Sequence, residues 1–171
     1  MLFRSLYIIL SGLLLLVLVV VLIGALLPRA RTETKQCILN APVDVVFAIV
    51  TNNQEWHYRS SLDDLEIIRT QGDIEEWEET TYGVTIRFKT LEKRPHSFYS
   101  FEMDSKMFTG EWQAIFEPEE GGKTLFTAIE KIEYKNLFYR LVGYAFMDLN
   151  KFINTYQEEL TVRIELEKAG Q

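Results

Sequence analysis

The chain has 171 residues, of which 47% are hydrophobic and 25% are charged, with a formal net charge of −7, one cysteine and two histidines. Residues 32–171 hold all 25 acidic residues but only 15 of the 18 basic ones, so their net charge of −10 excludes the basic surface that a nucleic-acid-binding domain presents. One cysteine excludes an internal disulfide, and with two scattered histidines it excludes a structural zinc site, so we expect no metal and no cofactor.

An apolar segment covers residues 6–27, after a short tail of residues 1–5, and only Tyr7, Ser11, Gly12 and Gly24 interrupt its run of Leu, Ile, Val and Ala. The segment contains no charged residue and would form a helix about 33 Å long, which matches the roughly 30 Å hydrocarbon core of a bilayer. A cleaved signal peptide is the alternative, but its apolar part is shorter and ends at small residues, whereas this segment ends in Leu-Leu-Pro-Arg. The pattern predicts a single-pass transmembrane helix.

The basic residues around this segment indicate its orientation. Arg4 and the terminal amine precede it, while Arg29, Arg31 and Lys35 follow it. Because positive charge gathers on the cytoplasmic side of a membrane, the excess after the segment places the C-terminal domain in the cytoplasm. The lone thiol of Cys37 fits a reducing compartment.

After a linker of residues 28–33, residues 34–168 have the patterning of one α+β domain. A short strand (34–39) leads to an amphipathic helix that begins at the Asn-Ala-Pro step and ends near Thr51. From Asn136 onward, apolar residues recur at helical spacing for about thirty residues, which predicts one long C-terminal helix. Between the helices, alternating segments separated by turn signals predict six strands. They are Leu62–Thr70, Ile74–Tyr82, Val84–Lys93, Ser97–Asp104, Thr109–Glu117 and Thr124–Tyr134.

The short turns between successive strands predict an antiparallel meander. A sheet this wide twists and curls, so the long C-terminal helix would lie across its concave face. A sheet wrapped on a helix in this way favours a cavity between them. A filled core without a cavity is the alternative.

Three stretches resemble the START-like, polyketide cyclase/dehydrase (SRPBCC) superfamily, whose members share the helix-grip fold. Residues 38–52 are similar to its first strand, Ala-Pro step and first helix, and Trp56 follows where members often place a tryptophan. Residues 109–112 and 118–124 are similar to a strand, a glycine turn and the next strand, and residues 137–160 to the C-terminal helix. The resemblance implies a cavity for a hydrophobic or lipid-like small molecule. It supplies no catalytic residue, because the family has no shared catalytic motif.

The inward positions of the strands and of the long helix are the candidate ligand-binding residues. Trp112 and Phe116 alternate with Glu111 and Glu117, so their side chains should face the core. Small residues among the aromatic ones favour open volume. The predicted set is Ile86, Phe88, Trp112, Ala114, Phe116, Phe126, Ala128, Glu130, Leu141, Ala145 and Leu149.

Glu130 is the ionisable member of this set. If Phe126 and Ala128 face the cavity, strand alternation puts Glu130 there as well, whereas the opposite register leaves it in water. A carboxylate in an apolar cavity must be paired or take a raised pKa. Such a group suits either ligand orientation or acid catalysis.

The other ionisable groups favour no chemistry. His57 and His96 have no Ser, Cys or Asp at the spacing of a catalytic triad, so we interpret both as exposed loop histidines. Five acidic residues surround Trp77, and because a strand sends neighbours to opposite faces, they predict a solvated hairpin rather than a calcium site. These residues are Asp73, Glu75, Glu76, Glu78 and Glu79.

The leading hypothesis is a membrane-anchored domain that binds a hydrophobic or lipid-like small molecule without turnover. A cyclase/dehydrase- or hydrolase-type enzyme that uses Glu130 or a histidine is the first alternative. The second is a membrane-tethered protein-interaction domain that uses its acidic surface.

Overall fold

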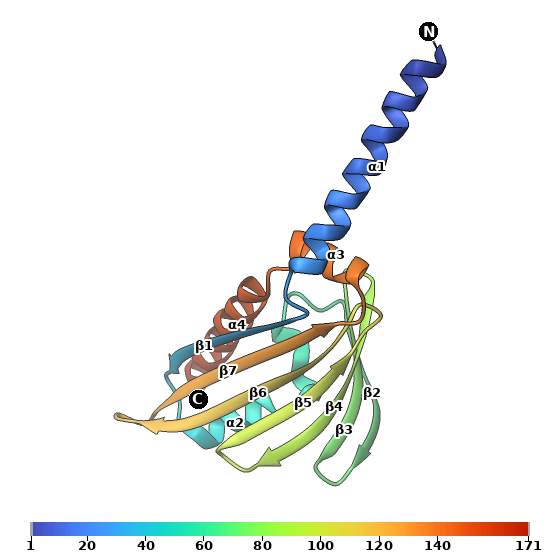
Figure 1. Cartoon of the computed structure of the whole chain (residues 1–171). Coiled ribbons are helices and arrows are strands. Elements are labelled where there is room, and N and C mark those ends of the chain that lie inside the picture. Colours follow the sequence, from blue (N-terminus) through green and yellow to red (C-terminus); the bar gives the residue numbers. More distant parts are fainter. Residues whose placement is uncertain (1, 171) are drawn as a thin grey trace.

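The computed structural model describes residues 2–170, and its first element is the helix α1 (Leu2–Leu26). Met1 of the predicted tail lies outside the described residues, and the rest of that tail belongs to α1. The helix projects away from the domain (Figure 1), with its large apolar side chains exposed. Its segment Leu6–Leu26 is long and apolar enough to cross a membrane.

Seven antiparallel strands form one open sheet in the order β1-β7-β6-β5-β4-β3-β2. Strands that follow one another from β2 to β7 are neighbours, so the predicted meander and the α+β class are confirmed. The strands are β1 (Ala30–Leu39), β2 (Asp64–Gln71), β3 (Ile74–Thr81), β4 (Val84–Arg94), β5 (Phe98–Asp104), β6 (Phe108–Glu119) and β7 (Lys123–Tyr134).

The strand β1 begins earlier than the sequence predicted and takes up most of the segment expected to be a linker. Arg31 is already in register with Ile132 of β7, and the Tyr134 amide donates to the Arg29 carbonyl oxygen at 3.0 Å. The free hydrogen-bonding edge of β7 satisfies these backbone groups, which would otherwise need water. Only residues 27–29 therefore separate α1 from β1.

The sheet curves around α2 (Val43–Val50), the short 3₁₀ helix η1 (Asn53–Tyr58) and α4 (Leu149–Ala169), as Figure 1 shows. The core lies between these helices and the concave face, which we call the inner face of the sheet. This is the helix-grip fold, as predicted. Fully buried side chains from both layers include Leu39, Phe126, Ile132, Leu149 and Leu160.

The predicted single C-terminal helix is wrong, because the structure has two helices, α3 (Leu137–Phe146) and α4. The Asp148 side chain accepts the Lys151 amide at 3.1 Å and so begins α4 as its N-cap. Of the predicted helix residues, Leu149 is buried in the core. Leu141 contacts Gly24 of α1 instead, and Ala145 is exposed, because the break lets α3 pack between β7 and the end of α1 rather than along the sheet.

Candidate functional site

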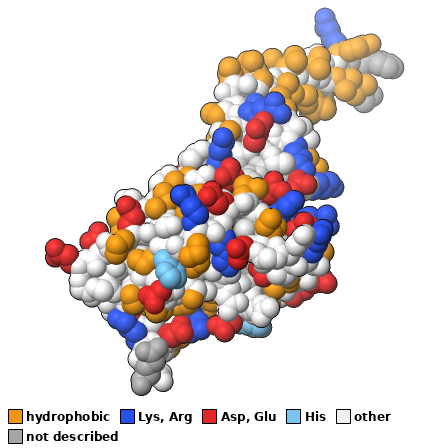
Figure 2. All heavy atoms as spheres, turned by 90° about the horizontal axis from the view of Figure 1, so that it is seen from below, with side chains coloured by type: hydrophobic (Ala, Val, Ile, Leu, Met, Phe, Trp, Pro, Cys, Tyr) orange, Lys and Arg blue, Asp and Glu red, His pale blue; other side chains and the backbone are white. Residues whose placement is uncertain are grey.

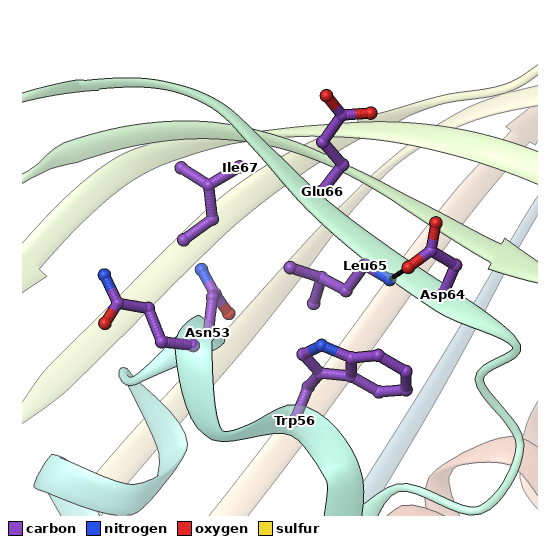
Figure 3. A pocket seen from close by; sticks show the side chains of 7 residues that line it. Asn53, Trp56, Asp64, Leu65, Glu66 and Ile67 are labelled. Atoms are coloured by element: carbon purple, nitrogen blue, oxygen red, sulfur yellow. Dashed lines mark hydrogen bonds between the residues drawn. The ribbon is translucent and has the colours of Figure 1, made fainter.

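A hollow of about 450 Å³ lies between η1 and β2, an edge strand of the sheet. Figure 3 shows the Trp56 indole, Leu65 and Ile67 gathered around it, whereas Glu66 points to the other side of β2. The lining therefore combines three apolar residues with four amide or carboxylate residues. Its lining residues are Asn53, Gln54, Trp56, Asp64, Leu65, Glu66 and Ile67.

The inner face continues from β2 to β3 beside this hollow. Leu65 lies opposite Glu79, and Ile67 lies opposite Trp77. Trp77 and Glu79 are both buried, although one of them is a carboxylate. Because residues directly opposite each other in a ladder share a face, the hollow adjoins a buried acidic group.

Arg59, the residue that follows η1, holds this carboxylate. Its Nη1 donates to Glu79 Oε1 at 2.6 Å and its Nη2 to Oε2 at 2.8 Å, while the Trp77 indole Nε1 donates to Oε1 at 3.0 Å. Two parallel N–H···O bonds are the strong form of this pairing. Burial alone would lower the pKa of Arg59, but the charge and hydrogen bonds of Glu79 outweigh it and raise that pKa. Arg59 therefore remains positively charged.

Tyr58 and Tyr156 complete the arrangement from η1 and α4. Their hydroxyl groups lie close enough to affect each other's pKa, and the Arg59 guanidinium lies 5.7 Å from the centroid of the Tyr156 ring. Burial raises the pKa of both tyrosines, so both hydroxyls stay neutral. We call these connected residues the inner polar cluster. Its members are Tyr58, Arg59, Trp77, Glu79 and Tyr156.

Asn53 connects the rim of the hollow to the sheet. Its Nδ2 donates to Glu75 Oε2 at 2.9 Å, and its side chain lies near Tyr99, whose pKa it acts to lower. Burial outweighs this and raises the pKa of Tyr99 to about 12, so this hydroxyl is neutral as well. The bond to Glu75 fixes η1 against β3 and so helps to set the width of the hollow.

The predicted ligand-binding residues of the strands share the inner face and form its apolar layer. Phe116 packs on Phe126 with ring centroids 5.4 Å apart, and Ala114 lies opposite Ala128, both fully buried. Among the described residues, none of this set lines the hollow beside β2. The structure thus brings together Ile86, Phe88, Trp112, Ala114, Phe116, Phe126 and Ala128 as core residues.

Glu130 lies on the same face, opposite Trp112 of β6 and Glu33 of β1, and is half-buried. Burial raises its pKa to about 7; Arg31 acts against this shift and Glu33 adds to it. The hydrogen bonds found within residues 2–170 include none to its carboxylate. At neutral pH, Glu130 is thus divided between its protonated and ionised forms.

The two histidines lie outside these clusters. His57 stacks on the Trp56 ring with centroids 4.4 Å apart, and His96 meets Phe47 edge-on at 5.7 Å. Both are exposed, as predicted. Within the described part of the chain, no group of three or more His, Cys, Asp or Glu side chains is placed to hold a metal ion.

The prediction of a solvated acidic hairpin is wrong for the inner side of β3. Glu78 faces outward and pairs with Arg87 at 2.7 Å, but the next residue, Glu79, is buried against Arg59. The sequence contained one signal for this, because Trp77 shares a face with Glu79 under strand alternation. The sequence analysis missed Arg59 and Glu79.

Residues 31–162 match the family model described as polyketide cyclase / dehydrase and lipid transport. The chain belongs to this family. Among curated proteins, none matches the sequence.

Solved structures share the helix-grip fold of this polyketide cyclase/dehydrase family member. A START superfamily protein from Mycobacterium smegmatis has a TM-score of 0.60 and 14% identity, over 79% of this chain and 97% of its own. The Zhui aromatase/cyclase from Streptomyces sp. R1128 has a TM-score of 0.66 and 11% identity, over 80% of this chain and 94% of its own. Norcoclaurine synthase from Thalictrum flavum has a TM-score of 0.63 and 8% identity, over 79% of this chain and 86% of its own. At these identities the likeness shows the fold alone.

Proposed function

We propose that this family member is a membrane-anchored binding domain for a hydrophobic or lipid-like small molecule, without turnover. The observation that carries the proposal is the hollow of about 450 Å³, where Trp56, Leu65 and Ile67 adjoin the inner polar cluster. Small-molecule sites combine apolar walls with placed polar groups, and three of the seven residues that line this hollow are apolar. The lipid-transport part of the family description supports the same class of ligand.

The apolar helix α1 supports the anchoring. Figure 2 shows hydrophobic side chains continuous along α1, whereas on the visible face of the domain they are mixed with charged ones. The basic residues that follow the span favour a cytoplasmic domain. The acidic domain supports no nucleic-acid partner.

The pairing inside the domain supports binding without turnover. A general acid or base must be able to gain or lose a proton near the working pH. Arg59 is held in its charged form by Glu79, and burial keeps the Tyr58 and Tyr156 hydroxyls protonated. These groups can donate to and accept from the polar end of an amphipathic molecule while keeping their protons.

Native mass spectrometry of the full chain, purified from membranes of its own host, tests the proposal. Ile67→Trp should place a larger side chain in the hollow and reduce any copurifying small molecule, since Ile67 lines it. Ile68→Trp is the matched control, because Ile68 is the next residue and is exposed. Equal adducts on both variants would refute this site. No adduct on the wild-type chain would favour the interaction-domain alternative.

Glu130 favours one second candidate, an enzyme of the cyclase/dehydrase type. Its carboxyl has a pKa of about 7, which suits proton transfer at neutral pH, and it lies beside Trp112 on the inner face. This candidate predicts that the protein turns over a polyketide-like substrate and that Glu130→Gln abolishes the turnover while the copurifying adduct persists. Those results would establish this candidate in place of the first.

A further inference from the structure

The helix α3 carries apolar side chains that no other part of the domain covers. Phe138 is 66% exposed, Phe146 is 84% exposed, and Ala145 between them is also exposed. At about 3.6 residues per turn, these positions fall within one side of the helix. Exposed aromatic rings at this density are unusual for a surface in contact with water alone.

The same helix is fastened to the end of α1 nearest the domain. Gly24 leaves room for Leu137 and Leu141, since a Cβ atom at Gly24 would lie 2.8 Å from Leu141 Cγ. Arg140 Nη1 donates to the carbonyl oxygens of Gly24 at 3.2 Å and Leu27 at 3.0 Å. These carbonyls have no partner within α1, so Arg140 caps the helix and complements the negative end of its dipole.

The connection between α1 and the sheet leaves little freedom for the domain to move away. Three residues lie between Leu26 and Ala30, so the Cα atoms of these two residues can be at most about 14 Å apart. The backbone of this segment is also held, because Arg29 accepts the Tyr134 amide at 3.0 Å. The orientation of α1 therefore determines where α3 lies relative to any bilayer that α1 crosses.

We propose that α3 lies in the membrane–water interface, with Phe138 and Phe146 among the lipids of the bilayer that α1 spans. The exposed face of α3 is continuous, through Leu141, with the apolar surface of α1. Aromatic side chains are enriched at this depth of a membrane, and amphipathic helices lie in its plane. The proposal rests on the anchoring proposed above, and it adds that the domain sits directly on the bilayer.

Depth measurements on the full chain in phosphatidylcholine vesicles test this. In a Cys37→Ser background, one spin label each is placed by Phe138→Cys, Phe146→Cys, Leu166→Cys and Leu16→Cys. Leu166 is the matched control, because it is 65% exposed, nearly as much as Phe138, and lies about 25 Å along α4 from Leu149. The readout is accessibility to oxygen, which concentrates in lipid, against accessibility to an aqueous nickel chelate.

Labels at positions 138 and 146 should be more accessible to oxygen than to the chelate, while the label at 166 shows the reverse. If positions 138 and 146 behave like 166 while position 16 lies in the hydrocarbon core, the anchoring stands and the interfacial docking of α3 is refuted. If position 16 is also in water, the anchoring itself fails. All four sites are exposed, so the labels leave the packed core unchanged.

Discussion

The buried pair of Arg59 and Glu79 provides the sharpest test of the structure. Arg59→Met leaves the Glu79 carboxylate with the Trp77 indole but without its countercharge. The Glu79 side chain is 8% exposed and that of Arg59 is 23% exposed, so water can replace only part of what is lost. Removing one partner of a buried pair typically costs about 3–5 kcal/mol, and the partial exposure of Arg59 places this case near about 3 kcal/mol.

For a domain of this size, that loss corresponds to a fall in Tm of roughly 10 °C. The double variant Arg59→Met/Glu79→Met removes both charges and should recover most of the difference, because apolar side chains of similar length replace the pair. The measurement is thermal unfolding of the full chain in detergent micelles, followed by near-ultraviolet circular dichroism of the buried aromatic residues.

Arg87→Met is the matched control, since Arg87 forms a 2.7 Å pair with Glu78, the residue before Glu79, on the outer face. Exposed pairs contribute little, so its Tm should stay near that of the wild-type chain. A Tm for Arg59→Met as high as that for Arg87→Met would refute a buried pair. A double variant less stable than Arg59→Met would show that the two charges are not coupled.

Three further predictions follow from single positions. Gly143→Ala should lower the free energy of unfolding by about 1–3 kcal/mol, because the added Cβ atom would overlap the Tyr134 ring. Gly12→Ala is the control, and it should leave the melting temperature unchanged, because no atom lies within 4 Å of the added Cβ atom. Burial raises the pKa of Glu130 from 4.5 to about 7, so ionisation opposes folding and stability falls as pH rises between these values. Glu130→Gln should therefore stabilise the domain by about 3 kcal/mol near pH 8 and by little near pH 4, and an equal effect at both pH values would contradict this shift. Burial raises the pKa of Cys37 to about 11, so an impermeant maleimide should label this thiol only slowly in the native chain. With a cytoplasmic domain, labelling should require that the cells are opened and the protein is denatured. Labelling of Cys37 while the cells are still intact would reverse the orientation.

Strand alternation predicted the inner face wherever the two faces differ in polarity. In β6, Trp112 and Phe116 alternate with Glu111 and Glu117, and only one register buries the aromatic rings. The hydrophobic effect therefore decides the register locally, and the sequence is sufficient. In β7 apolar residues occur on both faces, so alternation left two registers open, and the structure buries Phe126 and Ala128.

The alternation in β3 was not sufficient, because carboxylates occur on both of its faces. Glu78 and Glu79 are adjacent and chemically equivalent, and what separates their environments is Arg59, twenty residues away in the chain. A buried charge is stable only where its partner is brought within hydrogen-bonding distance, and that is a property of tertiary structure. The hollow beside β2 was missed for the same reason, since η1 forms its second wall.

The apolar periodicity after Asn136 predicted helix correctly, but it did not show that α3 packs against α1 as well as against the sheet. Residues 137–147 are apolar on more than one side, so a helix there needs more than one apolar surface against it. The sheet covers one side through Gly143, which allows the close approach of Tyr134, and α1 covers another through Leu141. Phe138 and Phe146 then remain on a third side. An unbroken helix along the sheet would leave the contact with α1 unmade, and Asp148, a good N-cap residue, makes the break inexpensive.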